Sequence, residues 1–229
     1  MADLPMRLLT AIQLQQAGQL EEAARHYITV LNEDPNHADA NHLLGLVLHE
    51  QGEHSAALTM IDKAIEHRSN VALYHANRGR ILKACGKISE AALAFTSALR
   101  NQPGDPEILS DLAGINLELA NVDNALMFVI RALEHDPDLP SGQYNYGLAL
   151  IAMKQYEAAK GALKKCIELE PDFVAALFEL GLLFQTEGQT EYAESYYRAV
   201  LAVDSKFFEA HVNLANILRG RHELEESVI

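Results

Sequence analysis

Asparagine and carboxylate side chains recur at one repeated position along the chain. Asn77, Asn145 and Asn213 are equally spaced, and Asp111 and Glu179 lie midway between them. An asparagine amide offers donors and an acceptor together, so it can pair with a peptide group at both ends. A spaced row of such amides could therefore hold the backbone of an extended chain. Alternatively, these asparagines bond within the protein itself.

Histidines and cysteines show no pattern typical of a metal or catalytic site. His42 and His49 lie seven residues apart, a long reach for one ion, and no HExxH pair assists them. Cys85 and Cys166 belong to no CxxC pair, which argues against a zinc site or a disulfide framework and favours a reducing cytoplasm. No Gly-rich phosphate loop and no GxSxG motif occurs. We therefore predict no enzyme, no metal and no cofactor.

The elements that position these residues follow one constant period along the chain. Gly45, Gly79, Gly147 and Gly181 fall into one column of this period, which Ala11, Ala113 and Ala215 complete. A second column is Ala23, Ala57, Ala91, Ala125, Ala159 and Ala193. The columns predict six full units, 4–37, 38–71, 72–105, 106–139, 140–173 and 174–207, and a partial seventh, 208–229.

Each period contains the pattern of two helices. Residues 38–51 carry apolar side chains at three- and four-residue spacing, as an amphipathic helix requires. A glycine then closes this first helix in four units, at Gly18, Gly52, Gly86 and Gly188. The second helix ends near a proline in four units, at Pro35, Pro103, Pro137 and Pro171. A helix pair of this kind buries its apolar side only by stacking on neighbouring pairs.

These columns resemble the tetratricopeptide repeat family, whose pattern W-x2-L-G-x2-Y…A-x3-F…P recurs with a period of about 34 residues. The third unit matches at Gly79, Leu82, Ala91, Phe95, Ala98 and Pro103. The resemblance implies an all-α, right-handed superhelical solenoid of antiparallel helix pairs, with residues 1–229 forming one solenoid. It also implies a concave groove, lined by the first helices, that binds a peptide segment or helix of a partner protein.

The positions that line this groove in the family can be carried over one unit at a time. They give His42, Leu46, His49, Asn77, Arg80, Lys83, Asp111, Tyr144, Asn145, Leu148, Phe178, Glu179, Asn213 and Asn216 as candidate peptide-binding residues. The asparagine row resembles the ladder in the repeat region of O-linked N-acetylglucosamine transferases. Tyr144 and Phe178, beside Leu148, indicate either an apolar pocket in the groove or core packing between units.

Two polar residues depart from their apolar columns. Arg78 stands in the column of Leu44, Leu112, Tyr146, Leu180 and Leu214, and Asn116 stands in the column of Leu48, Leu82, Leu150 and Phe184. An unpaired buried charge costs several kcal/mol, so we expect Arg78 to reach water or a partner such as Asp111. The seventh unit is expected to begin a second helix at Glu225 and to stop after about one turn. This ending suggests a piece of a longer protein.

The net charge of −14 disfavours nucleic acid and anionic membranes as partners. No apolar run reaches the roughly 20 residues that cross a membrane, and no secretory signal is recognisable, so we expect a cytoplasmic protein. The leading hypothesis is a scaffold that binds another protein. One alternative is the substrate-recruiting repeat region of a larger enzyme, because residues 14–23 and 36–45 are similar to repeat regions of bacterial O-linked N-acetylglucosamine transferase-like or sulfotransferase proteins. Another is self-association through an uncapped C-terminal end.

Overall fold

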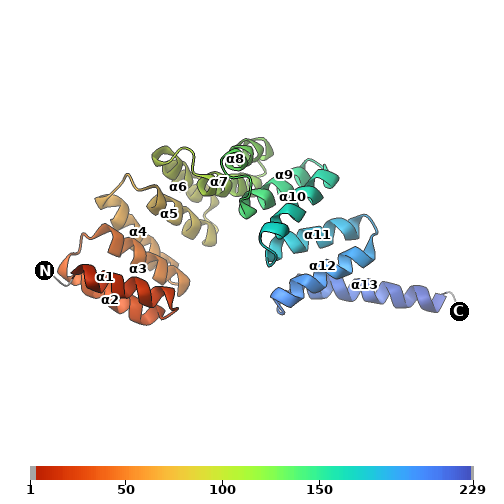
Figure 1. The fold of residues 1–229 in the computed structure, drawn as a ribbon, viewed down its shortest axis with the longest axis horizontal. Helices are drawn as coiled ribbons and strands as arrows, with labels where there is room; N and C mark the ends of the chain where they lie inside the picture. The colour runs from red at the N-terminus through yellow and green to blue at the C-terminus, as the bar shows by residue number, and fades with distance from the viewer. Residues whose placement is uncertain (1–3, 228–229) are drawn as a thin grey trace. The chain divides into compact units, whose positions relative to one another are not determined.

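The computed structural model describes the backbone of residues 4–227 and the side chains of residues 4–220. Within that range the chain forms thirteen α-helices and no strand, so the prediction of an all-α fold of paired helices is confirmed. Figure 1 shows their order. The helices are α1 (Leu4–Gln16), α2 (Leu20–Glu33), α3 (Ala38–Glu50), α4 (His54–His67), α5 (Ala72–Ala84), α6 (Ile88–Asn101), α7 (Pro106–Glu118), α8 (Val122–His135), α9 (Pro140–Ala152), α10 (Tyr156–Leu169), α11 (Val174–Thr186), α12 (Thr190–Val203) and α13 (Phe208–Ser227).

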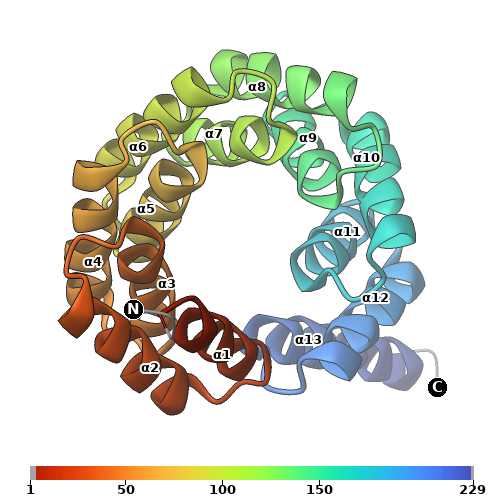
Figure 2. The ribbon, with the colours of Figure 1, turned by 60° about the vertical axis from the view of Figure 1, so that its left-hand side comes forward.

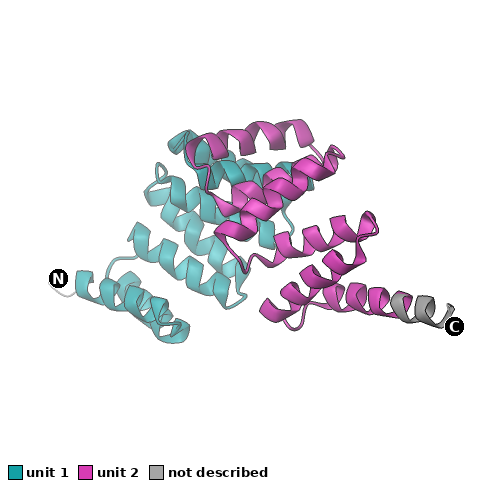
Figure 3. Ribbon diagram, turned by 45° about the vertical axis from the view of Figure 1, so that its right-hand side comes forward, with its two compact units in different colours: residues 1–119 teal, residues 120–229 magenta. Residues whose placement is uncertain are grey.

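The helices divide into two compact units, residues 1–119 and residues 120–229 (Figure 3). Unit 1 holds α1 to α7, and unit 2 holds α8 to α13. In each unit the first helices of the repeats form one layer and the second helices form another (Figure 2). Successive first helices begin one period apart, at Leu4, Ala38, Ala72, Pro106, Pro140, Val174 and Phe208. That residues 1–229 form a single solenoid domain stays a prediction.

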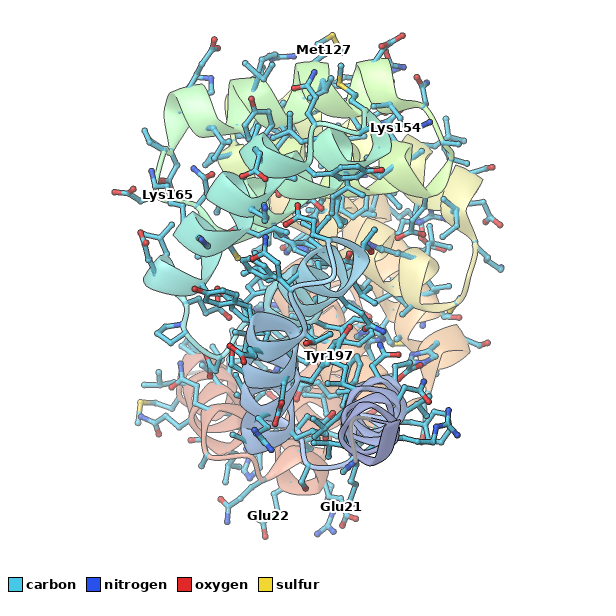
Figure 4. The ribbon with its side chains drawn as sticks, turned by 90° about the vertical axis from the view of Figure 1, so that its right-hand side faces the viewer. Glu21, Glu22, Met127, Lys154, Lys165 and Tyr197 are labelled. Carbon is cyan, nitrogen blue, oxygen red and sulfur yellow. The ribbon has the colours of Figure 1, made fainter. Side chains whose placement is uncertain are left out.

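Small residues on the first helices let bulky side chains of the second helices approach closely. A Cβ atom added to Gly45 would lie 2.7 Å from Ile61 Cγ1, and one added to Gly181 would lie 2.6 Å from Tyr197 Cε1. Tyr197 is fully buried in unit 2. Figure 4 shows Tyr197 among the helices, whereas Met127 lies at the periphery. The column of small residues is therefore a packing requirement of the helix pair.

The turn between the two helices of a repeat passes through one residue with positive φ. Four glycines take this conformation, with φ between 72° and 83°, and they close the first helix as predicted: Gly18, Gly52, Gly86 and Gly188. In the fourth and fifth repeats the same position holds Ala120, with φ 56°, and Lys154, with φ 61°. A side chain at positive φ costs roughly 1–2 kcal/mol. The turn is thus imposed by the helix packing even where the sequence provides no glycine.

The seventh repeat differs from the prediction. Instead of a turn followed by a new helix at Glu225, α13 continues without a break from Phe208 to Ser227. Its turn position holds His222, a residue with a Cβ, and only five helical residues follow it in α13. The expected start of a second helix is therefore wrong.

The two departures from the apolar columns are satisfied locally. Arg78 Nε donates to Asp62 Oδ1 on α4 at 2.7 Å, so its partner is Asp62 and the suggested pairing with Asp111 is wrong. The Asn116 side chain is buried and donates to the carbonyl oxygen of Leu112, one turn earlier in α7, at 2.7 Å. Both polar groups therefore have partners in unit 1, and neither creates an unpaired buried charge.

Candidate functional site

The candidate site is the side of the first-helix layer that points away from the second helices, which we call the first-helix face. All predicted peptide-binding residues lie on first helices. In unit 1 these are His42, Leu46 and His49 on α3, Asn77, Arg80 and Lys83 on α5, and Asp111 on α7. In unit 2 they are Tyr144, Asn145 and Leu148 on α9, Phe178 and Glu179 on α11, and Asn213 and Asn216 on α13.

Four of these residues form a chain of hydrogen bonds across α3, α5 and α7. Asn77 Nδ2 donates to His42 Nε2 at 2.9 Å. Arg80 Nη1 donates to Asn77 Oδ1 at 3.1 Å, and Arg80 Nε donates to Asp111 Oδ2 at 2.9 Å. Both ends of the Asn77 amide thus have partners inside unit 1. At Asn77 the structure supports the alternative that the asparagine bonds within the protein.

Burial decides the protonation of this chain. His42 is 3% exposed and its ring lies 4.6 Å from that of Tyr74. Burial lowers the pKa of His42 to about 4, against the opposing influence of Asp39. Burial raises the pKa of Asp111, and the neighbouring Arg80 guanidinium opposes that shift. At neutral pH this series of hydrogen bonds therefore begins at the neutral imidazole of His42 and ends at an ion pair between Arg80 and Asp111, with a nitrogen–oxygen distance of 2.8 Å.

The remaining predicted residues of unit 1 are also engaged. Lys83 Nζ lies 2.9 Å from Glu118 Oε1, a second ion pair between α5 and α7. His49 Nδ1 lies 2.8 Å from His54 Nδ1, across the turn between α3 and α4. Leu46 is half-buried and packs against the core cluster around Ile61. The charged groups of α5 and α7 therefore cross-link the first-helix face of unit 1.

A hollow of about 330 Å³ opens beside Arg80 in unit 1. Leu73, Ala76 and Ile108 give it an apolar lining, and Arg80, Gln102, Asp105 and Glu107 give it polar groups. Leu73 is 53% exposed. Asp105 Oδ1 accepts from the backbone nitrogen of Ile108 at 3.0 Å and so caps α7. The hollow thus combines an exposed leucine with a guanidinium whose orientation is fixed by Asp111 and Asn77.

The aromatic residues predicted in unit 2 contact other rings. The Tyr144 ring lies 5.1 Å from that of Phe173, and the Phe178 ring lies 5.0 Å from that of Phe207 and 5.8 Å from that of Tyr197. Both predicted rings pack beside the main core cluster of unit 2. Core packing therefore accounts for much of their surface, although Tyr144 and Phe178 are only half-buried. The half-buried Leu148 lies one turn beyond Tyr144 on α9.

Three polar residues in unit 2 share the column of Asn77. Asn145, Glu179 and Asn213 are all half-buried. Asn213 makes a side-chain hydrogen bond to Tyr197, whose hydroxyl also donates to Gln185 Oε1 at 2.5 Å. Burial raises the pKa of Glu179 above its ordinary value. The exposed Asn216 accepts from Arg219 Nη2 at 3.1 Å on the same helix, α13.

No group of three or more metal-ligating side chains occurs in the described residues. His42 uses Nε2 for Asn77, and His75 Nε2 bonds to the carbonyl oxygen of Ser69 at 2.8 Å. His42 and His49, which raised the question of a metal, therefore both have hydrogen-bond partners within unit 1. None of the described helices has the length and apolar content needed to cross a membrane.

The sequence reasoning missed one periodic device. A polar side chain near the start of some first helices bonds to the backbone carbonyl oxygen six residues earlier, in the preceding loop. The pairs are Asn41 with Pro35, His75 with Ser69, Gln143 with Pro137, and His211 with Ser205, at 2.8–3.0 Å. We call these residues the loop clamps. Their spacing in whole periods was visible in the sequence, but the change between Asn, His and Gln concealed it.

Thirteen helices in stacked antiparallel pairs within the described range, with small residues between them, define a helical repeat protein. Three family models, each described as tetratricopeptide repeat, match residues 14–81, residues 76–140, and the two segments 140–173 and 174–207. The chain therefore belongs to the tetratricopeptide repeat family.

Known proteins with similar sequence or structure are diverse. Rat DnaJ homolog subfamily C member 3 is 24% identical over 223 residues, which cover 89% of this chain and 43% of the relative. Cellulose synthase 1 operon protein C from Komagataeibacter xylinus is 28% identical over 144 residues, 58% of this chain and 11% of the relative. The chain thus spans less than half of these curated relatives.

Among solved structures, the APC/C hetero-tetramer Cut9–Hcn1 matches with a TM-score of 0.85 and 19% identity. The match covers 94% of this chain and 43% of the matched chain. PilF from Pseudomonas aeruginosa matches with a TM-score of 0.77 and 19% identity, covering 94% of this chain and 98% of the other. At this identity the likeness establishes the fold.

Proposed function

We propose that this chain is a protein-interaction scaffold that binds a segment of a partner protein on the first-helix face. The observation that carries the proposal is the hollow beside Arg80, with its exposed Leu73. An apolar side chain of a partner placed there would remove both its own surface and that of Leu73 from water, at about 25 cal/mol per Å². Arg80 at the edge offers donors to a peptide carbonyl or carboxylate.

Three further observations support a protein partner. The net charge of −14 opposes the phosphates of nucleic acids. The described residues contain no metal-ligating cluster that would indicate catalysis by a bound metal. The matched chain of similar fold comes from the hetero-tetramer Cut9–Hcn1, and we extend a protein partner of that general kind to this chain.

The test is affinity capture from a native lysate with three baits: the unaltered chain, Leu73→Asp and Leu93→Asp. Both leucines are exposed, at 53% and 70%, and both belong to the repeat 72–105, but Leu93 lies on the second helix α6. Circular dichroism and thermal unfolding check that all three baits fold. Proteins captured by the unaltered chain should be lost with Leu73→Asp and retained with Leu93→Asp. If Leu73→Asp captures the same proteins as the unaltered chain, the hollow is not the binding site.

The alternative of a repeat region that recruits substrates for a larger enzyme has one observation in its favour. The curated relatives are more than twice as long as the part that matches this chain, since it spans 43% and 11% of them. A gene whose reading frame continues from this segment into a catalytic domain would support that role. This alternative includes the proposal, made from residues 14–23 and 36–45, that the chain is related to the repeat regions of O-linked N-acetylglucosamine transferase-like or sulfotransferase proteins.

Self-association is the third proposal, and α13 carries it. Phe208 is 72% exposed and Val212 is 41% exposed, and Ala215 is exposed although its column is otherwise buried. A second copy could cover this apolar side of the helix. Light scattering over a range of concentrations tests the idea, with Phe208→Ser as the variant expected to reduce any dimer. A monomer at the highest concentration would exclude it.

A further inference from the structure

Two carboxylates occupy equivalent positions in the internal repeat. Asp111 and Glu179 lie two periods apart, on α7 of unit 1 and α11 of unit 2. Asp111 is paired with Arg80, which lies one repeat earlier on α5, with a nitrogen–oxygen distance of 2.8 Å. The equivalent of Arg80 two periods later is Leu148. Where the repeat in unit 1 supplies a guanidinium for the carboxylate, the repeat in unit 2 supplies a leucine.

A second ion pair of unit 1 is replaced in the same way. Lys83 and Glu118 join α5 to α7 at 2.9 Å. Their equivalents two periods later are Ile151 and Thr186, which carry no charge. The first-helix face of unit 2 is therefore more apolar than that of unit 1, and Glu179 is the carboxylate that interrupts it.

Glu179 has no cation to balance its charge within residues 4–220. It forms no ion pair there with a lysine, arginine or histidine, and burial is the one resolved cause of its raised pKa. Its neighbours are aromatic: burial raises the pKa of Tyr144 and of Tyr197 to about 12, and the charge of Glu179 adds to both shifts. A half-buried carboxylate beside phenol rings is costly to keep ionised unless a cation joins it.

We propose that the first-helix face of unit 2 binds a partner segment in which an arginine or lysine is flanked by apolar residues. The cation pairs with Glu179 as Arg80 pairs with Asp111, and the apolar neighbours lie against Tyr144, Leu148 and Phe178. The inference deepens the proposed function, because it rests on partner binding at first helices, and it names the chemistry of the partner. A basic residue of the partner would complement the charge of Glu179, because Leu148 occupies the position from which Arg80 pairs with Asp111 in unit 1.

The test is selection of random dodecapeptides, displayed on phage, against the folded chain. Peptides enriched on the unaltered chain should carry arginine or lysine between apolar residues. The same selection on Glu179→Gln should lose the basic residue, and on Glu179→Lys it should favour aspartate or glutamate instead. Glu168→Gln is the matched control, because Glu168 is an exposed glutamate on the second helix α10 and the change in net charge is the same. It should keep the basic preference.

A second variant supplies the missing cation from within the chain. Leu148→Arg places a guanidinium where unit 1 has Arg80, so it should occupy Glu179 and remove the basic preference without unfolding the protein. The affinity of a selected synthetic peptide, measured by isothermal titration calorimetry, should fall by about tenfold or more for Glu179→Gln and for Leu148→Arg. Glu179→Gln should also raise the midpoint of thermal unfolding of the free chain, because a neutral amide is cheaper to bury.

The outcomes separate this inference from the proposed function. If peptides selected on the unaltered chain show no basic preference, or if Glu179→Gln keeps that preference, the inference is overturned. Peptides that bind the unaltered chain and depend on Leu73 but not on Glu179 would support the scaffold proposal and overturn the proposed binding of a basic residue at Glu179. Peptides indifferent to both residues, or no enrichment at all, would count against both.

Discussion

At the scale of single residues, comparison of the repeats shows which residues adopt a backbone conformation that is unfavourable for their type. Ala120 and Lys154 adopt the positive φ that glycines adopt in the other repeats. Both positions are exposed, so neither side chain is kept there by burial. The packing of the helices on either side therefore offsets the free-energy cost of the left-handed backbone.

Ala120→Gly and Lys154→Gly should each increase the free energy of unfolding by about 1 kcal/mol, because glycine adopts positive φ without the clash of a Cβ atom. Urea unfolding followed by circular dichroism measures the change. As a control, Ala152→Gly at the end of α9 should decrease stability by about 1 kcal/mol, since it is an ordinary helical position. Equal losses at all three positions would contradict the conformational explanation.

His42 should make stability depend on pH. Its pKa is about 4 in the folded protein, below the ordinary value of 6.5, so the unfolded chain takes up a proton first as the pH falls. This contribution to stability is fully present above pH 6.5 and is lost as the pH falls from 6.5 to 4, by up to about 3.5 kcal/mol at 1.4 kcal/mol per pKa unit. Thermal unfolding across this range should show the loss.

His42→Gln removes that titration and should flatten the pH dependence. His67→Gln, at an exposed position of α4, is the control and should leave it unchanged. If the unaltered chain and His42→Gln lose the same stability between pH 6.5 and 4, the protonation of His42 is not the cause.

At the scale of the elements, the loop clamps fix how one repeat leads into the next. Gln143 Nε2 donates to the carbonyl oxygen of Pro137 at 2.9 Å and joins the start of α9 to the loop after α8. Leu109 and Leu177 occupy the same column and are buried. The repeats therefore use either a hydrogen bond or apolar packing at this junction.

Gln143→Ala should decrease the free energy of unfolding by about 1–2 kcal/mol. The Pro137 carbonyl loses one of its two side-chain donors, since Lys165 Nζ also donates to it at 2.8 Å, and the buried side-chain volume of Gln143 is lost as well. Gln143→Leu is the matched variant and should cost less, since it restores the residue type of the fourth and sixth repeats. Denaturant unfolding of both variants measures the difference. A leucine variant as unstable as the alanine variant would argue that the hydrogen bond alone secures the junction.

At the scale of the whole molecule, each helix contacts few others, so local damage should stay local. Gly181→Val in α11 should decrease stability by about 1–3 kcal/mol, because even its Cβ would lie 2.6 Å from Tyr197 Cε1. Hydrogen exchange with mass spectrometry should show the loss of protection in α11 and α12 first. An equal loss in α3 and α4 would show that the chain unfolds as one cooperative body.

The sequence alone determined the repeat, its phase and its pairing of helices, because the same packing requires the same residue types in every period. A glycine or alanine at the crossing of two helices, and a glycine at most of the turns, recur wherever the helix pair recurs. The family and the fold class followed from these columns. Because six copies of the unit carry the same pattern, the sequence predicts the positions of the helices and turns within each full unit closely.

Only the tertiary structure decided which polar side chains meet. Asn77 and Asn213 share a column, yet one bonds to His42 and Arg80 and the other to Tyr197. Arg78 was expected to reach water or a partner such as Asp111, and the structure shows that its partner is Asp62, whereas Asp111 pairs with Arg80. Such pairings depend on residues of adjacent helices that the period brings together but does not repeat. For the same reason, the missing partner of Glu179 became visible only once the Arg80–Asp111 pair was placed.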